Sequence, residues 1–150
     1  LARARRGTWR VAVVEDSMAP AIRSGDWLLV DPTVDHWPRR GSVVLFREPE
    51  TGLLAIKRVV ARPGDWIRFA DGWLELADDE AWLQGDATDE ALEATGHGRA
   101  VDSRRYGPVS IEALVGRAWF RYWPADRIGL IEGAAARVGS ADGRPPLDAD

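Results

Sequence analysis

Short apolar segments separated by turn-forming residues recur along most of the 150-residue chain, and this pattern is typical of β-strands. Two pairs of segments predict hairpins because each pair flanks a turn signal, Pro-Glu-Thr-Gly at 49–52 in the first pair and Asp-Gly at 71–72 in the second. The chain is therefore predicted to be mostly β, a single domain of coiled antiparallel sheets or an open barrel. The predicted strands cover residues 9–13, 26–31, 42–47, 53–60, 65–69, 73–76 and 114–123, with a continuation over 127–131.

Few segments fall outside this strand pattern. Residues 18–23 and 111–114 have a brief helical pattern, and the acidic stretch 78–98 predicts a loop. Residues 1–10 form a basic N-terminal segment, and residues 139–150, rich in Gly, Pro, Ala and Asp, are predicted to be a disordered tail. One folded domain is therefore expected over residues 11–138.

The composition narrows the range of partners. A net charge of −4 and a pI near 5.2, with no dominant basic stripe, argue against a nucleic-acid partner. The chain has no cysteine, which excludes a disulfide or a thiolate metal site, and no metal or other cofactor is expected. No apolar run approaches the ~20 residues that a membrane-spanning helix needs. The N-terminal arginines are predicted to be solvated, with contact to anionic lipid headgroups as the alternative.

The most informative candidate chemistry is a serine and a lysine that stand forty residues apart. Ser17 follows an apolar segment, whereas Lys57 lies within the apolar strand predicted over 53–60. A serine hydroxyl needs an adjacent base to act as a nucleophile, and a lysine made neutral by burial can be that base. Local sequence also allows a simpler interpretation, in which Ser17 caps a short helical turn and Lys57 lies on a solvated strand face with Arg58 inward.

Four short blocks in a fixed order surround these two residues and carry a family resemblance. They are Ser17-Met18-x-Pro20 with Gly25-Asp26, Lys57-Arg58-Val59 with Pro63-Gly64-Asp65, Gly85-Asp86, and Asp102-Ser103-Arg104 with Gly107 and Val109. Their order and spacing resemble the type I signal peptidase family over about residues 11–124. The resemblance implies a signal-peptidase-like catalytic domain at 11–138 and a serine endopeptidase with a serine–lysine dyad.

The same resemblance implies roles for individual residues. Ser17 is expected to be the nucleophile, with its own backbone N–H as the oxyanion donor, and Lys57 the general base. An extended peptide is expected to lie beside residues 53–56, with small side chains one and three residues before the scissile bond. The implied substrate-binding residues are Met18, Ile22, Leu54, Ala55 and Ile56, and structural support is implied for Arg58, Asp102, Ser103 and Arg104, with Arg58 and Asp102 as an ion pair.

Three positions depart from the family pattern. Glu15 replaces a small or hydroxyl residue two positions before the nucleophile, and its side chain is expected to point away because a carboxylate would oppose a developing oxyanion. Ala100 stands where the family often has a serine that holds the lysine, so Ser103 is the expected substitute. Ala87 replaces the asparagine that commonly follows Gly-Asp. These departures leave an inactive binding module as an alternative.

The resemblance favours removal of N-terminal signal or leader peptides from precursor proteins after small residues, in an Ala-x-Ala-like context. Two alternatives share parts of the pattern: a soluble maturation protease for one precursor, similar to the nickel superoxide dismutase maturation protease, and a self-cleaving regulator similar to the SOS-repressor proteases. Trp119, Phe120 and Trp123 predict contact with a membrane surface, with core packing as the alternative. The chain is expected to be membrane-associated if an N-terminal anchor precedes it, and cytoplasmic otherwise.

Overall fold

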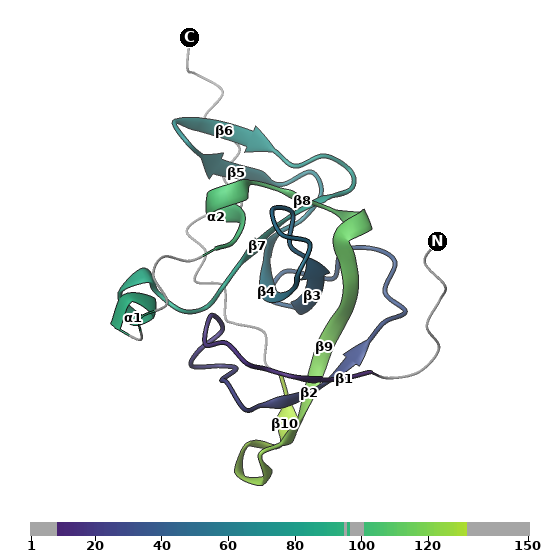
Figure 1. The fold of residues 1–150 in the computed structure, drawn as a ribbon. Coiled ribbons are helices and arrows are strands. Elements are labelled where there is room, and N and C mark those ends of the chain that lie inside the picture. Colours follow the sequence, from purple (N-terminus) through teal and green to yellow (C-terminus); the bar gives the residue numbers. More distant parts are fainter. Residues whose placement is uncertain (1–8, 95, 97–100, 132–150) are drawn as a thin grey trace.

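The computed structural model describes residues 9–94, 96 and 101–131 (Figure 1). Strands dominate these residues, which confirms the predicted fold class. The strands are β1 (Trp9–Ala12), β2 (Trp27–Asp31), β3 (Val43–Arg47), β4 (Leu54–Ala61), β5 (Trp66–Phe69), β6 (Gly72–Glu75), β7 (Glu80–Gln84), β8 (Val109–Ser110), β9 (Leu114–Trp123) and β10 (Gly129–Leu130). The helices are α1 (Asp89–Ala94) and α2 (Ser103–Tyr106), with the 3-10 turns η1 (Ile111–Ala113) and η2 (Ala125–Arg127).

Most of the strands belong to one antiparallel sheet with the order β1-β2-β9-β3-β4-β7-β8, to which β10 adds beside β9. The β5–β6 hairpin forms a separate two-stranded sheet. In Figure 1 the long strand β9 runs past both β2 and β3, its two neighbours in the sheet. Register shifts interrupt the β2–β9, β3–β9 and β4–β7 pairings. Such irregularities bend a sheet and increase its twist, which gives the coiled form that the sequence predicts.

Three apolar clusters fill the space around the sheet. The first packs Met18 and Ile22, from the loop after β1, against β2, β3 and β9. The second lies between β3, β4, β7 and β8 around Trp37, and the third joins the β5–β6 hairpin to β4 and β7 through Ile67 and Trp82. Because β4 lies between β3 and β7 in the middle of the sheet, its second half is buried on both faces.

The acidic stretch predicted as a loop contains the main departure from the expected elements, since both β7 and α1 lie within it. Ala81, Trp82 and Leu83 of β7 are buried, and the residues just before the strand, 77–79, are exposed. A strand covered on both faces has no polar alternation, so its apolar core is too short to be recognised between carboxylates.

Other segments differ in smaller ways. Residues 18–22 form turns rather than a helix, whereas the predicted helical turn at 111–113 is confirmed as η1. The segment expected to continue β9 instead reverses at η2 and returns as β10, antiparallel to β9. The predicted tail at 139–150 and most of the basic segment lie outside the described residues.

Candidate active site

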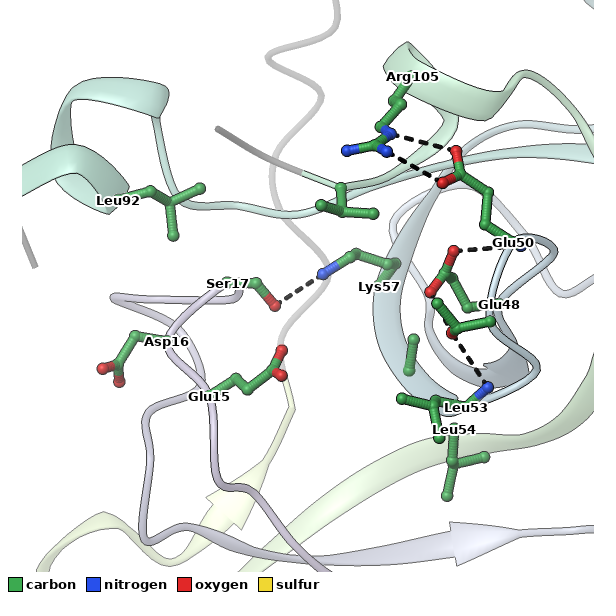
Figure 2. A pocket seen from close by; sticks show the side chains of 13 residues that line it. Glu15, Asp16, Ser17, Glu48, Glu50, Leu53, Leu54, Lys57, Leu92 and Arg105 are labelled. Carbon is green, nitrogen blue, oxygen red and sulfur yellow. Dashed lines mark hydrogen bonds and ion pairs between the residues drawn. The ribbon is translucent and has the colours of Figure 1, made fainter. Parts of the chain in front are cut away.

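The predicted serine–lysine pair forms in the structure. Figure 2 shows the two side chains pointing toward one another, with Ser17 Oγ and Lys57 Nζ 2.7 Å apart. Lys57 lies on β4, and Ser17 lies in the turn after β1. The alternative in which Lys57 faces solvent while Arg58 points inward is wrong, because both side chains are buried, each residue being only 5% exposed. Both can be buried because β4 is covered on its two faces.

The segment that follows β7 holds the backbone of Ser17 in place. The Ala87 N–H donates to the Ser17 carbonyl oxygen at 3.0 Å. Gly85 approaches the same oxygen so closely that a Cβ on it would lie only 2.6 Å away, a separation that requires the backbone to shift. The same Cβ would lie 3.7 Å from Cδ of Lys57. A glycine at position 85 therefore allows the loop between β1 and β2 (residues 13–26), which carries Ser17 and is called the serine loop below, to approach β4.

Burial controls the protonation of Lys57. Desolvation lowers the pKa of Lys57 below its ordinary value of 10.5, because the ammonium form loses its hydration. The negative charges of Asp102 and Glu15 act in the opposite direction, but the pKa stays lowered. A neutral lysine has a lone pair on Nζ, so the 2.7 Å contact then lets the Ser17 hydroxyl donate its proton to that nitrogen.

Arg58 pairs with Asp86 and not with Asp102, which corrects the ion pair expected from the sequence. Its Nε and Nη2 donate to the two carboxylate oxygens of Asp86 at 2.8 and 2.6 Å, and its Nη1 donates to the Gly41 carbonyl at 2.7 Å. This bidentate ion pair joins β4 to the segment after β7, which also holds the backbone of Ser17. The sequence feature that could have indicated the Arg58–Asp86 pair is the Gly85-Asp86 block. Its glycine lies against the Ser17 carbonyl, and its aspartate binds Arg58.

Asp102, at the start of α2, binds the segment that follows β7. Its buried carboxylate accepts from Arg104 Nη2 at 2.7 Å, from the Arg104 backbone N–H at 3.0 Å and from the Gly85 N–H at 3.0 Å. Burial alone would raise the pKa of Asp102, but the hydrogen bonds from Arg104 and Gly85 outweigh it and hold the pKa below the ordinary value. Asp102 therefore pairs with Arg104, whereas the sequence led us to expect a pair with Arg58.

Ser103 is buried but does not take the expected place of a serine beside Lys57. Its Oγ accepts from the Leu83 backbone N–H at 2.9 Å, which ties α2 to β7. The predicted contact of Ser103 with Lys57 is thus corrected to a structural one. Ala100, the position at which the family often has a serine, lies outside the described residues.

A cleft of about 500 Å³ opens on Ser17 and Lys57. Its walls come from the serine loop, the turn between β3 and β4, α1 and α2 (Figure 2). A smaller cavity of about 100 Å³ lies between residues 11–15 and the first residues of β4. Leu54 and Ala55 line both cavities, which therefore lie next to each other along the start of β4.

Three of the five predicted substrate-binding residues line these cavities. Leu54 and Ala55 line both, and Ile56 lines the smaller one. Met18 and Ile22 are instead fully buried in the core next to β2, β3 and β9. Their predicted contact with substrate is therefore corrected to support of the serine loop from within the core.

The cleft is more acidic than the sequence suggested. Glu15 is exposed and lines both cavities, instead of pointing away from the site as expected. Asp16, Glu48 and Glu50 line the larger cavity, and Glu50 forms an ion pair with Arg105 of α2 at 3.1 Å. These carboxylates are visible in the sequence, but only the position of the β3–β4 turn opposite the serine loop brings them together.

Asp26, of the Gly25-Asp26 block, anchors the end of the loop that carries Ser17. The residue is 1% exposed, and its oxygens accept from Arg127 Nη1 at 2.7 Å and from Arg121 Nη1 at 3.1 Å. Both arginines also donate to the Ala21 carbonyl, at 2.7 Å from Arg121 and 3.2 Å from Arg127. The turn between β9 and β10 is thereby fastened to the loop that carries Ser17.

The eight tryptophans are divided between core and surface. Trp37 and Trp82 are buried, and Phe120 is half-buried. Two of the three residues expected at a membrane surface are exposed, and further apolar side chains are exposed on neighbouring elements. The exposed apolar residues of β2, β9, β10 and the connecting turn are Trp27, Trp119, Trp123, Ile128 and Leu130.

The chemistry available at the site is therefore that of a hydroxyl beside a buried amine. Within the described ranges, no three His, Cys, Asp or Glu side chains converge so that they could hold a metal ion. None of the helices in the described part of the chain is long and apolar enough to cross a membrane. A hydroxyl next to a proton acceptor in an open cleft can act as a nucleophile in acyl transfer.

Comparison with known proteins confirms the family resemblance. Residues 7–100 match the family described as signal peptidase, peptidase S26. The chain is 30% identical over 148 residues to a probable signal peptidase I-2 of Synechocystis, covering 83% of this chain and 67% of the relative. It is also 30% identical over 125 residues to mitochondrial inner membrane protease subunit 1 of Xenopus tropicalis, covering 77% of this chain and 70% of the relative.

Some relatives are much longer than this chain. It is 26% identical over 144 residues to thylakoidal processing peptidase 1 of Arabidopsis thaliana, covering 78% of this chain. The chain spans only 42% of that relative and 39% of probable thylakoidal processing peptidase 2. The family match at 7–100 includes Ser17, Lys57 and the Gly-Asp block at 85–86.

Proposed function

Because the chain belongs to the signal peptidase family S26, we propose that it is a serine endopeptidase that removes N-terminal signal or leader peptides from precursor proteins. The observation that carries this proposal is the 2.7 Å contact between Ser17 Oγ and the Nζ of buried Lys57. The cleft of about 500 Å³ beside this pair supports a peptide as the substrate.

In the proposed reaction, Ser17 forms an ester with the leader peptide. Neutral Lys57 accepts the hydroxyl proton while Oγ attacks the scissile carbonyl carbon, and a tetrahedral oxyanion results. The ammonium of Lys57 then donates its proton to the leaving nitrogen, and the C–N bond breaks. Water then loses a proton to Lys57 and attacks the ester carbonyl. The bond to Ser17 Oγ breaks, Lys57 returns the proton to Oγ, and the leader leaves with a carboxyl end.

The Ser17 backbone N–H is the proposed donor to the oxyanion. The neighbouring carbonyl, that of Ser17 itself, is held by the Ala87 N–H at 3.0 Å, which restrains the backbone at this point. Glu15 cannot contribute a second donor, because an ionised carboxylate only accepts hydrogen bonds. Stabilisation of the oxyanion therefore depends on how firmly the serine loop is held.

The first half of β4 offers an edge to which an extended peptide can add. β3 pairs with β4 over residues 54–58, whereas β7 pairs with β4 only from Arg58 onward. Among the described strands, none pairs with the other side of Leu54, Ala55 and Ile56. A peptide bound there would gain main-chain hydrogen bonds and direct alternate side chains to the same face.

This arrangement supports a preference for alanine-sized residues one and three positions before the scissile bond. Side chains two residues apart on a strand face the same side, and the smaller cavity holds only about 100 Å³. A peptide library varied at these two positions, with cleavage sites mapped by mass spectrometry, tests the proposal. We expect a bulky residue at either position to lower kcat/KM by roughly tenfold or more. Preference for bulky or charged residues at both positions would contradict it.

The proposal includes contact of the enzyme with a membrane surface. Trp119 and Trp123 are 37% and 54% exposed, while Phe120 is half-buried between them in sequence. Tryptophan favours the boundary between water and lipid because its ring is apolar and its N–H is polar. Trp119 and Trp123 are therefore the proposed contact residues, and Phe120 has a smaller part.

A further inference from the structure

Glu15 lies where the two cavities of the site meet. It stands two residues before Ser17 and lines both cavities, as Leu54 and Ala55 do from the opposite wall. Figure 2 shows its carboxylate turned toward the space in front of Ser17 and Lys57. A peptide that extends from the smaller cavity to Ser17 must therefore pass this carboxylate.

Glu15 is close enough to raise the pKa of Lys57, but its carboxylate has no ion-pair partner among the described residues. Glu15 forms no ion pair or hydrogen bond with any other residue in the described part of the chain. Glu48 lines the same cleft, and its carboxylate accepts from neutral donors, the Glu50 N–H at 3.2 Å and Thr51 Oγ1 at 2.6 Å. When Lys57 is neutral, as the proposed reaction requires, the cleft has an excess of negative charge.

Exposed apolar side chains also line the two cavities. Val14 is 81% exposed and Leu53 68% exposed, and Leu54 and Val101 are partly exposed next to the same cavities. Exposed apolar side chains around a groove are typical of a binding surface for another chain. The site therefore combines exposed apolar side chains with several carboxylates, and among these Glu15 lines both cavities close to Ser17.

We propose that Glu15, assisted by Glu48, makes the enzyme select precursors that carry a lysine or arginine beside the scissile bond, outside the positions one and three before it. The inference rests on the endopeptidase function proposed above and names its substrate class. An ammonium or guanidinium supplies the donors that the Glu15 carboxylate lacks, whereas an acidic side chain is repelled by both carboxylates.

Peptides that differ in one side chain test this selection. The substrates are a set of decapeptides with alanine one and three positions before the scissile bond. At each of the other positions near that bond, one position at a time, they carry lysine, glutamine or glutamate. We expect kcat/KM for the lysine peptide to exceed that for the glutamine peptide by about fivefold at one or more positions, as for an ion pair at a protein surface. The glutamate peptide is cleaved more slowly than the glutamine peptide, and added salt reduces the differences.

The variant Glu15→Gln identifies the residue responsible. The ratio of kcat/KM for the lysine and glutamine peptides falls to about one in Glu15→Gln, and it is unchanged in the control Glu75→Gln, an exposed residue of β6. Glu15 also affects the pKa of Lys57, as do Asp102, Arg104 and Glu48, but a ratio of two peptides on one enzyme cancels that effect. A ratio within about twofold of one at every position in the unmodified enzyme, or a ratio retained in Glu15→Gln, would overturn the proposal.

Binding of the same peptides to Ser17→Ala separates this proposal from the function on which it rests. If the unmodified enzyme cleaves none of the peptides, the endopeptidase function fails. The affinities of Ser17→Ala for the lysine and glutamine peptides, measured by fluorescence anisotropy, then still decide the role of Glu15. If the peptides are cleaved but both the kinetic and the affinity ratios are close to one, only the selection by Glu15 fails.

Discussion

Lys57 is held 2.7 Å from Ser17 Oγ on a strand that is buried on both faces, and this burial has a cost in stability. The pKa of Lys57 is lowered in the folded protein, so the unfolded chain binds more protons between the lowered value and the ordinary value of 10.5. The contribution of Lys57 to the free energy of unfolding therefore decreases as the pH falls through that window. Below the lowered pKa the penalty stays constant, because both states are then protonated.

The same shift predicts the pH dependence of activity. We expect kcat/KM to rise as Lys57 loses its proton, giving a rising limb at a pH below the ordinary lysine pKa. Because the charge of Glu15 raises the pKa of Lys57, the variant Glu15→Gln should move this limb to lower pH. Cleavage of one neutral peptide from about pH 5 to about pH 10 measures both profiles.

The two histidines provide the control for this assignment. His36→Gln and His97→Gln remove every imidazole of the chain, one at a time, and should leave the rising limb in place. Loss of the limb in either variant would show that Lys57 is not the general base.

The segment that most directly positions Ser17 is the one that follows β7. In Gly85→Ala the new Cβ would lie 2.6 Å from the Ser17 carbonyl oxygen, so the serine loop must move away from β4. A misplacement of this kind is expected to lower kcat/KM by roughly a hundredfold while the sheet stays folded. Gly72→Ala on β6 is the matched control, because a Cβ there meets nothing within 4 Å. Kinetics and circular dichroism of both variants check this, and wild-type kcat/KM in Gly85→Ala would contradict it.

Which strands the sequence could predict depended on whether a turn signal or polar alternation marked them. The strands of the β3–β4 and β5–β6 hairpins were predicted because a turn signal separates them. β7 was not, since its apolar core of Ala81, Trp82 and Leu83 shows no alternation and acidic residues precede it. Short helices such as α2 depend on tertiary contacts, here the hydrogen bond from the Leu83 N–H of β7 to Ser103 Oγ, and a four-residue segment has too little pattern of its own.

The parts of the candidate site that depend on motif spacing could be predicted from the sequence. The parts that depend on three-dimensional packing could not. The family resemblance identified Ser17 and Lys57, and the structure brings them into contact. It did not show that Met18 is buried, because that depends on how the loop after β1 packs on β2, β3 and β9. Nor did it show that Arg58 pairs with Asp86, because that depends on how the segment after β7 lies beside β4. The acidic cleft was missed for the same reason.

At the scale of the whole molecule, the serine loop and the exposed apolar surface are joined. Arg127 of η2 and Arg121 of β9 donate to Asp26 and to the Ala21 carbonyl, so the turn between β9 and β10 is fixed to the loop after Ser17. Trp123 precedes this turn and is 54% exposed. A membrane bound at Trp123 would therefore hold the cleft at a fixed position relative to the lipid.

Sedimentation with lipid vesicles tests the membrane contact. We expect the unmodified protein to sediment with anionic vesicles, and the double variant Trp119→Ser/Trp123→Ser to lose most of this binding because its apolar surface is reduced. Trp73→Ser on β6, in the separate two-stranded sheet, serves as the control and should retain binding. Equal sedimentation of the double variant and the unmodified protein would rule out this surface.

We propose that Ser17 and Lys57 act as one catalytic unit, and peptide turnover by the two single variants and by their combination tests this proposal. Ser17→Ala and Lys57→Met should each reduce kcat/KM for a leader peptide to the background level, and the double variant should be no slower than either, because the loss of one partner already disables the other. Circular dichroism should show an unchanged fold, since methionine preserves most of the buried volume at position 57. Substantial turnover by folded Ser17→Ala would contradict the proposal that Ser17 and Lys57 form the catalytic unit.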